Sequence, residues 1–336
     1  MENAVKAHRS GVPGWLRSHR CNGSRAAFFL LIAITLPATG LFTQAVHAYT
    51  DQSEIRSPEE TMTQQARNGR WLQKQISKAK RGDVVSIPAG TYNVQDLKVF
   101  KTIKLVGEGE VVLQSLNPVS KGLLVPDLGV SLHVENITFR GARARDRNGA
   151  GIRHDGKDLW VINCVFDTNE DGILATGSEN GRIEIRNSTF LNNGHGDGYS
   201  HGVYLSSGAQ LLIYDSRFLG TKIGHHIKSL AGVTAVTGSY FDDVAGRSSY
   251  TLDVTRGGLV SFAGNFVMQR ATAENATIIN YDASRGGSAD QVRVVGNHFV
   301  NHHPSARLIR NPTRVTATVQ DNQITNEGRG RMSKAP

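Results

Sequence analysis

A short phrase that recurs eight times predicts an all-β fold, a parallel β-helix. Each copy is a β-branched run that ends at a turn, with an Asn, Asp or Gly three residues before a large apolar residue. These marked residues lie about 23 to 32 positions apart and are Asn136, Asn163, Asn187, Asp215, Gly238, Gly264, Gly296 and Asp321. So short a period indicates stacked supersecondary units rather than independent domains.

A second apolar patch lies between consecutive phrases, as in "HGVYL" at 201–205 and "YTLDV" at 250–254. Two or three short strands in about 25 residues are what one coil of a parallel β-helix needs, because each strand pairs with its equivalent one coil further on. A leucine-rich repeat has a similar period, but its leucine spacing is missing. Asn and Asp at stacked turns can bond backbone groups, so we expect the marked residues to form a ladder.

The first 48 residues have the order of an export signal. A basic segment precedes the apolar run at 26–42, and small residues follow up to Ala48. This order predicts cleavage after Ala48, and residues 49–57 then form a linker. The long basic segment and Pro37 leave an uncleaved membrane anchor as the alternative. The export signal predicts a periplasmic or secreted protein. No later stretch could span a membrane.

Composition limits the possible partners. The formal charge of +9 falls to about +5 without residues 1–48. A mildly basic exported protein is compatible with an acidic polysaccharide as partner, and we expect no nucleic-acid partner. Cys21 lies in the signal and Cys164 stands alone after it, so the mature chain can form no internal disulfide. We expect a monomer stabilised by packing.

The β-helix domain is predicted over residues 58–325. An open end of a β-helix exposes unpaired backbone and needs a cover. Residues 58–80 favour a helix and carry an apolar stripe of Trp71, Leu72 and Ile76, so we predict a capping helix there. The polar stretch 326–336 is expected to be a disordered tail.

The segment "RGDVVSIPAGTYNV" at 81–94 follows this helix, and together they resemble the opening of pectin-lyase-like right-handed β-helix proteins. "SHGVYLSS", "GHHIKSLAG" and "SSYTLDVTRGG" resemble a group of exported bacterial members of that superfamily, most of them uncharacterised. The resemblance covers most of residues 55–325 and implies a right-handed coil. The superfamily contains lyases, hydrolases, epimerases, esterases and adhesins, so function has to be inferred from the site.

The second patches predict a polar column on neighbouring coils. In register, Val203, Ile227, Leu252 and Ile279 point inward. The outward column is then Arg153, Leu174, Tyr204, Lys228, Asp253, Asn280 and Arg310. Neighbouring strands are about 4.8 Å apart, so Tyr204, Lys228 and Asp253 come within reach of one another. Three more candidates, His201, His225 and Tyr250, each precede an inward residue by two positions, and Arg256 follows in a turn. We expect His226 at the surface or in a turn.

This patch suits an acidic sugar. Cleavage of a uronate polymer by β-elimination needs a neutralised carboxylate, a base for the C5 proton and an acid for the leaving oxygen. Lys228 and Arg256 can neutralise the carboxylate, while Tyr204, His201 or His225 can move protons. C5 epimerisation begins with the same proton abstraction, so the sequence predicts a lyase or a C5-epimerase. The substrate-binding candidates are His201, Tyr250, Asp253, Asn280 and Arg153.

The segment "IKS", followed one coil later by "SYTLDVTRGG", is similar to the β-helix alginate and chondroitin lyases. This resemblance implies Lys228 as the base and Arg256 as the acid around a bound calcium ion. His225 and His226 stand where acidic residues are expected, and histidines are poor calcium ligands, so we predict no cofactor.

The neighbour of Lys228 leaves a second assignment open. Asp253 favours the charged form of Lys228 and so opposes its use as a base. In that case Lys228 neutralises the substrate carboxylate, and Tyr204 or His225 is the base.

Two other classes of function remain. The same coils can form a non-catalytic carbohydrate-binding or surface protein, with Tyr204 and Tyr250 stacking on sugars and Lys228 and Asp253 as an ordinary ion pair. A glycoside hydrolase needs paired carboxylates, for which Asp155, Glu170 and Asp171 are the candidates.

Overall fold

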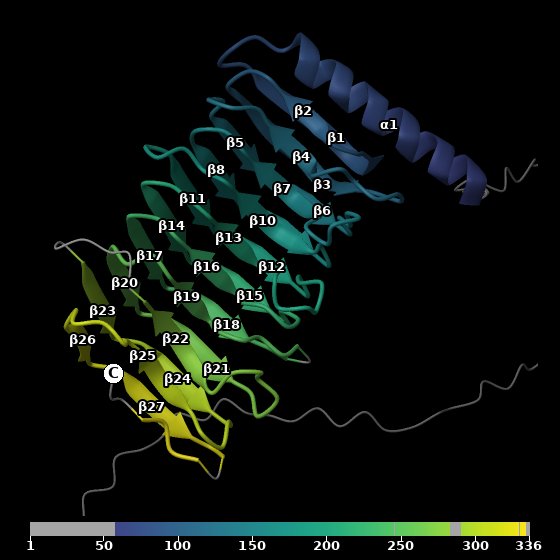
Figure 1. Ribbon diagram of the computed structural model, residues 1–336. Coiled ribbons are helices and arrows are strands. Elements are labelled where there is room, and N and C mark those ends of the chain that lie inside the picture. The colour runs from purple at the N-terminus through teal and green to yellow at the C-terminus, as the bar shows by residue number, and fades with distance from the viewer. Residues whose placement is uncertain (1–57, 245, 283–289, 329, 334–336) are drawn as a thin grey trace, which may run out of the picture. The chain divides into compact units, whose positions relative to one another are not determined.

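The chain coils into a parallel β-helix, with equivalent strands stacked in successive coils (Figure 1). The computed structural model describes residues 58–244, 246–282, 290–328 and 330–333, and over these it confirms the predicted architecture. The expected export signal at 1–48 and linker at 49–57 lie outside these residues. Within them, the strands form one sheet of 18 and one of 9 strands.

The nine-stranded sheet receives one strand from each coil. Its strands are β2 (Leu97–Val99), β4 (Gly122–Pro126), β7 (Ala150–His154), β10 (Asp171–Ala175), β13 (Val203–Leu205), β16 (Ile227–Ser229), β19 (Leu252–Val254), β22 (Thr277–Tyr281) and β25 (Arg307–Arg310). In Figure 1 this sheet runs the length of the described coils.

The eighteen-stranded sheet is bent into two files. The long strands β1 (Val84–Asn93) and β3 (Ile103–Gln114) run along both. The first file continues with β5 (Leu132–Glu135), β8 (Leu159–Ile162), β11 (Arg182–Arg186), β14 (Gln210–Tyr214), β17 (Val233–Thr237), β20 (Leu259–Ala263), β23 (Gln291–Val295) and β26 (Ala317–Gln320). The second continues with β6 (Thr138–Arg140), β9 (Val165–Asp167), β12 (Thr189–Leu191), β15 (Arg217–Leu219), β18 (Tyr240–Asp242), β21 (Phe266–Gln269), β24 (His298–Asn301) and β27 (Gln323–Asn326).

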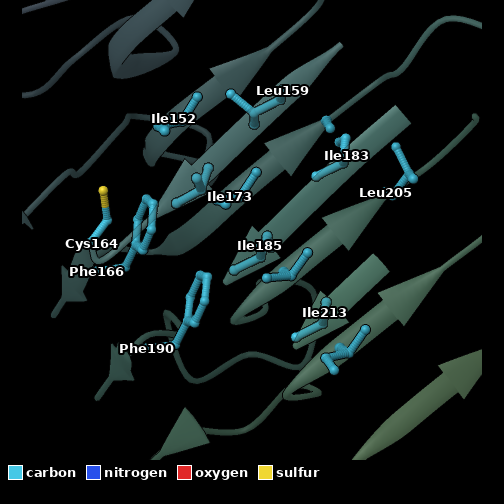
Figure 2. Packing of buried hydrophobic residues seen from close by; sticks show 14 of the residues in the cluster. Ile152, Leu159, Cys164, Phe166, Ile173, Ile183, Ile185, Phe190, Leu205 and Ile213 are labelled. Atoms are coloured by element: carbon cyan, nitrogen blue, oxygen red, sulfur yellow. The ribbon is translucent and has the colours of Figure 1, made fainter. Parts of the chain in front are cut away.

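The marked residues of the repeat make the turn between the two files. All eight have left-handed backbone, with φ from 48° to 66°. Asn, Asp and Gly adopt this conformation at the lowest cost, which explains why they recur there. The apolar residue three positions later points into the core, where phenylalanines of successive coils stack with centroids 4.6 to 5.0 Å apart. Figure 2 shows two of them, Phe166 and Phe190.

The expected ladder lies one position after the marked residues. The side chains of Ser188, Ser216, Ser239, Asn265, Asn297 and Asn322 each accept the backbone N–H of the equivalent residue one coil earlier, at 2.8 to 3.2 Å. In the marked column itself, Asn163 donates to Asn136 at 2.9 Å. The prediction was wrong by one residue because the left-handed turn directs the marked side chain toward solvent and the next one inward.

Helix α1 (Pro58–Lys78) covers the first coil, as predicted (Figure 1). Leu72 and Ile76 are buried, and Gln73 exchanges hydrogen bonds of 2.9 and 3.1 Å with the backbone of Lys98 in β2. Trp71, expected in the apolar stripe, is instead 39% exposed, so the buried face of the helix is narrower than predicted. No helix among the described residues is long and apolar enough to cross a membrane.

In the stretch 326–336, where a disordered tail is expected, the structure describes residues 326–328 and 330–333, and some of these make ordered contacts. Asn326 still belongs to β27, and its Oδ1 accepts the N–H of Met332 at 3.0 Å. Met332 is buried, and Ser333 makes backbone hydrogen bonds of 3.0 Å with Ala306 and Leu308. Polar composition did not reveal this packing because backbone groups and a single methionine make it.

Candidate functional site

The outward column of the nine-stranded sheet has the predicted register. Successive strands pair Arg153 with Leu174, then Tyr204, Lys228, Asp253, Asn280 and Arg310. Ile279, not Ile278, pairs with Leu252, so the inward column also matches the prediction. The polar side chains therefore lie on adjacent coils of one face.

A buried carboxylate organises this column. Asp253 is 3% exposed, and its Oδ1 accepts a hydrogen bond of 2.7 Å from Asn280 Nδ2. Lys228 Nζ lies 3.6 Å from Asp253 Oδ2 and 5.5 Å from the centre of the Tyr204 ring. Arg310 extends the chain of contacts by donating to Asn280 Oδ1 at 2.8 Å. Lys228, with its side chain 26% exposed, and the exposed Arg310 are the cations of this column that face solvent.

Beside this column, Asp171 at the start of β10 and the histidines two residues before β13 and β16 form a second ladder along the edge of the nine-stranded sheet. Asp171 Oδ1 accepts the N–H of His201 at 2.7 Å, His201 Nδ1 accepts that of His225 at 3.0 Å, and His225 Nδ1 accepts that of Tyr250 at 3.2 Å. The two imidazoles stack with centroids 4.7 Å apart. The sequence predicted both histidines in a polar surface patch, but they are 1% and 8% exposed. Their position in the ladder explains the burial.

The ladder determines where each histidine carries its proton. A ring nitrogen that accepts a backbone N–H has no proton of its own, so the neutral ring is protonated on Nε2. His225 Nε2 lies 3.4 Å from Asp253 Oδ2. Burial lowers the pKa of His225 to about 4, although Asp253 opposes this shift. Burial also lowers the pKa of His201 well below its usual value. At neutral pH His225 is therefore a donor without a free lone pair, which argues against the predicted role as base.

Tyr204 holds its proton at neutral pH. Its ring meets the His201 ring edge to face, with centroids 5.3 Å apart. Burial raises the pKa of the Tyr204 hydroxyl above 10, and the charges of Asp171 and Asp253 act in the same direction. A phenol of this kind can give a proton to a leaving oxygen but is a poor base.

Two predicted residues lie apart from this cluster. Arg256 is exposed in the turn after β19, where it lines a hollow of about 460 Å³ together with Glu179 and Asp290. Among the described residues it forms no hydrogen bond or ion pair with Tyr204 or Lys228. Arg153 is separated from Tyr204 by Leu174 and pairs with Asp155 at 3.1 Å. The turn carries Arg256 off the face of the sheet, which strand register could not predict.

The carboxylates considered for a glycoside hydrolase support the backbone instead. Glu170 is 2% exposed, and its Oε2 accepts the N–H groups of Ala144 and Gly149 at 2.8 Å each. Asp171 is fully buried, and burial raises its pKa well above the usual range. The third candidate, Asp155, is engaged by arginine, lysine and threonine side chains. Such an arrangement leaves no pair facing a glycosidic bond.

His226 lies in the core rather than at the predicted surface. It is 2% exposed, with Nδ1 2.7 Å from Thr221 Oγ1 and Nε2 3.1 Å from Asp243 Oδ1. Ser248 donates to the other oxygen of Asp243 at 2.9 Å. Sequence reasoning missed this group because its members come from two irregular turns on successive coils, one between β15 and β16 and one between β18 and β19, where strand register gives no alignment.

Calcium does not fit the positions that the lyase resemblance suggests. His225 and His226 occupy them, and both rings are already engaged by protein groups. Calcium takes oxygen ligands, which these side chains do not offer. Within the described ranges, no group of three or more His, Cys, Asp or Glu side chains is placed to hold a metal ion.

Comparison with known proteins agrees with the architecture. The family model described as right handed beta helix region matches residues 126–238 and 171–333. A solved alginate lyase from Paenibacillus sp. str. FPU-7 is similar over 80% of this chain and 96% of its own, with a TM-score of 0.55 and 15% identity. The structure of the PL6 family alginate lyase AlyGC is similar over 75% of this chain and 38% of its own, with a TM-score of 0.44 and 16% identity. No curated protein sequence matches. At these identities the likeness to solved structures shows the fold.

Proposed function

The chain belongs to the right-handed β-helix family, and we propose that this member is exported and cleaves an acidic, uronate-containing polysaccharide by β-elimination. The observation that carries the proposal is the column in which Tyr204 and Lys228 lie on adjacent coils beside the buried carboxylate of Asp253. The substrate class is supported by the fold's likeness to a protein named an alginate lyase, since alginate is a polymer of uronates.

Two side chains carry the proton transfers of the elimination. Lys228, as the neutral amine, takes the C5 proton, and the electrons of that C–H bond form the C4–C5 double bond. The C4–O bond breaks, and the Tyr204 hydroxyl gives its proton to the leaving oxygen. The products are an unsaturated uronate and a new chain end, and the proton on Lys228 then returns to the Tyr204 phenolate through solvent. Each step uses a group that the column exposes or half-exposes.

The other assignments are weaker on physical grounds. The raised pKa of Tyr204 opposes its use as the base, and both ring nitrogens of His225 are engaged. Arg256 lines a separate hollow, which argues against its predicted role as the acid. Lys228 remains as the base, at the expense of losing a proton near Asp253. We therefore expect kcat to rise as pH increases above neutrality.

The outward column also offers a path for the polymer. Arg153 and Arg310 each lie three strands from Lys228, about 14 Å at about 4.8 Å per strand. An acidic chain laid along the coil axis would meet positive charge on both sides of the reacting sugar. Asn280 belongs to the same path, and His201 and Tyr250 flank it through the ladder.

The test is incubation of the purified protein with alginate, pectate and glycosaminoglycans. New ultraviolet absorbance from an unsaturated uronate with any of them supports a lyase. Inversion at C5 seen by NMR without absorbance would replace the lyase with an epimerase. Binding measured by calorimetry without either change would point to a carbohydrate-binding protein, and the absence of all three signals would remove the proposed substrates.

A further inference from the structure

The ladder of the nine-stranded sheet reaches the outward column at a single histidine. Asp171, His201 and His225 each accept a backbone N–H from the next coil, so their inner ends serve the fold. The outer nitrogen of His225 lies 3.4 Å from Asp253, the carboxylate that also lies beside Lys228. The His225 ring therefore makes two contacts. Its Nδ1 supports the fold, and its Nε2 faces the candidate site.

We propose that His225 is a positioning residue, whose proton the ladder fixes on Nε2 and whose N–H holds Asp253 in place beside Lys228. Its effect on turnover rests on the proposed function, whereas the tautomer and the contact do not. His225 itself exchanges no proton with the substrate in this scheme.

The charge balance around Asp253 explains why the contact matters. A carboxylate that is 3% exposed needs donors for its oxygens. Asn280 serves Oδ1 at 2.7 Å, while Oδ2 is shared by His225 Nε2 and Lys228 Nζ at 3.4 and 3.6 Å. Without the imidazole N–H, Asp253 Oδ2 loses one of the two groups that lie beside it, and more of its negative charge faces Lys228.

The groups that surround His225 are consistent with a neutral ring. Lys228 and Asp253 face it from the outward column, His201 stacks on it and His226 follows it in the chain. The Tyr250 ring lies 5.0 Å away on the next coil. Burial outweighs the favourable charge of Asp253 and lowers the pKa of His225 to about 4, so the ring stays uncharged at neutral pH.

Two substitutions of His225 test the contacts of its two ring nitrogens separately. His225→Asn keeps an acceptor near the position of Nδ1 and loses the donor to Asp253. His225→Gln keeps a donor near the position of Nε2 and loses the acceptor for the backbone of Tyr250. The pair therefore tests the site contact and the ladder contact independently.

We expect His225→Asn to move the rising limb of kcat against pH upward by about one unit, which is about a tenfold loss at neutral pH. His225→Gln should keep the limb near that of the unchanged protein while lowering its melting temperature. A merely structural histidine would give the opposite result, with stability lost and no shift of the limb in either variant. Equal shifts in both variants would also overturn the proposal.

A second measurement is independent of activity. Long-range ¹H–¹⁵N NMR of the full chain with ¹⁵N-labelled histidine reports the tautomer, and the signal lost in His225→Gln identifies His225. We expect a neutral ring protonated on Nε2 down to about pH 5, in keeping with its lowered pKa. A ring protonated on Nδ1, or one that titrates near 6.5, would refute the positioning role. If the expected tautomer is found but no substrate is cleaved, the reaction is wrong and the contact stands.

Discussion

The two side-chain ladders of this β-helix perform the same structural task with different side chains. On the eighteen-stranded sheet, serines and asparagines from Ser188 to Asn322 satisfy backbone N–H groups of the neighbouring coil. On the nine-stranded sheet, Asp171, His201 and His225 do so. An imidazole has a second nitrogen on the far side of its ring, and that of His225 reaches Asp253. The asparagines also have a second polar group, but Asn265 and Asn297 direct it at backbone oxygens. The difference teaches that a ladder position becomes part of a site when its second polar group points at the outward column.

The largest expected effect is on turnover, and it should distinguish a substitution in the outward column of the nine-stranded sheet from one on the eighteen-stranded sheet. Lys228→Ala should reduce kcat by about 10² to 10⁴, because it removes the base while an outward side chain adds little to the core. Arg293→Ala is the matched control, since Arg293 is an exposed cation on the eighteen-stranded sheet. Circular dichroism and initial rates of absorbance give fold and turnover. Normal turnover in Lys228→Ala, or an equal loss in the control, contradicts the site.

A comparison of two buried histidines addresses stability. Burial lowers the pKa of both His154 and His225 to about 4, from an ordinary 6.5. Between these values the unfolded chain binds more protons, so stability is lost as pH falls from about 6.5 to 4, by up to about 3 kcal/mol for each histidine. Urea unfolding at pH 7 and pH 4.5 should show this fall.

The two histidines differ in their partners, and substitution should expose the difference. Within the described part of the chain, neither ring nitrogen of His154 has a hydrogen-bond partner, whereas both nitrogens of His225 lie near partner groups. We therefore expect His154→Leu to remove its share of the pH dependence and to stabilise the protein below pH 6. His225→Leu should destabilise it at every pH, because Tyr250 N–H and Asp253 lose a partner. Identical pH profiles for the two variants would contradict this reasoning.

A third prediction tests the ladder of the eighteen-stranded sheet. Asn297 is 1% exposed, and its side chain bonds Asn265, Asn322 and the backbone of Phe262. Asn297→Ala should lower the free energy of unfolding by about 2 kcal/mol, since it leaves buried polar groups unpaired, with kcat of the folded protein unchanged. Chemical denaturation measures this change in the free energy of unfolding.

The control for Asn297 is a marked residue. Asn187→Gly retains the left-handed backbone and removes an exposed side chain, so we expect a change within about 0.5 kcal/mol. If the two variants lose equal stability, the turn position contributes as much as the ladder and the distinction between them is wrong.

The smallest expected effect concerns the charge beside Lys228. Asp253→Asn removes the negative charge 3.6 Å from Lys228 Nζ, so the rising limb of kcat against pH should move down by about one unit. This shift is opposite in sign to that expected for His225→Asn. Asp155→Asn serves as control, because its carboxylate pairs with Arg153 and Lys121 instead. A limb that stays in place in Asp253→Asn indicates that Lys228 holds the substrate carboxylate and is not the base.

Strand register was the part of the site that sequence could predict. The column from Tyr204 to Asn280 follows from counting residues, because equivalent strands of a parallel β-helix pair coil by coil and alternate inward and outward. The period and the capping helix were readable for the same local reason. Arg256 was expected in a turn beside the patch, but the direction of that turn does not follow from strand alternation, and the side chain lines a separate hollow.

The sequence by itself determined the repeat, the fold class and which residues share a face, since these depend on local patterning and a nearly one-dimensional stack. Tertiary structure alone decided which of two consecutive turn residues points into the core. The ladder therefore passes through Ser188 and not Asn187. It also buried His201 and His225 and fixed their protons through backbone contacts with neighbouring coils. Burial and tautomer depend on atoms some 25 residues away in the chain, and no spacing within one repeat encodes them.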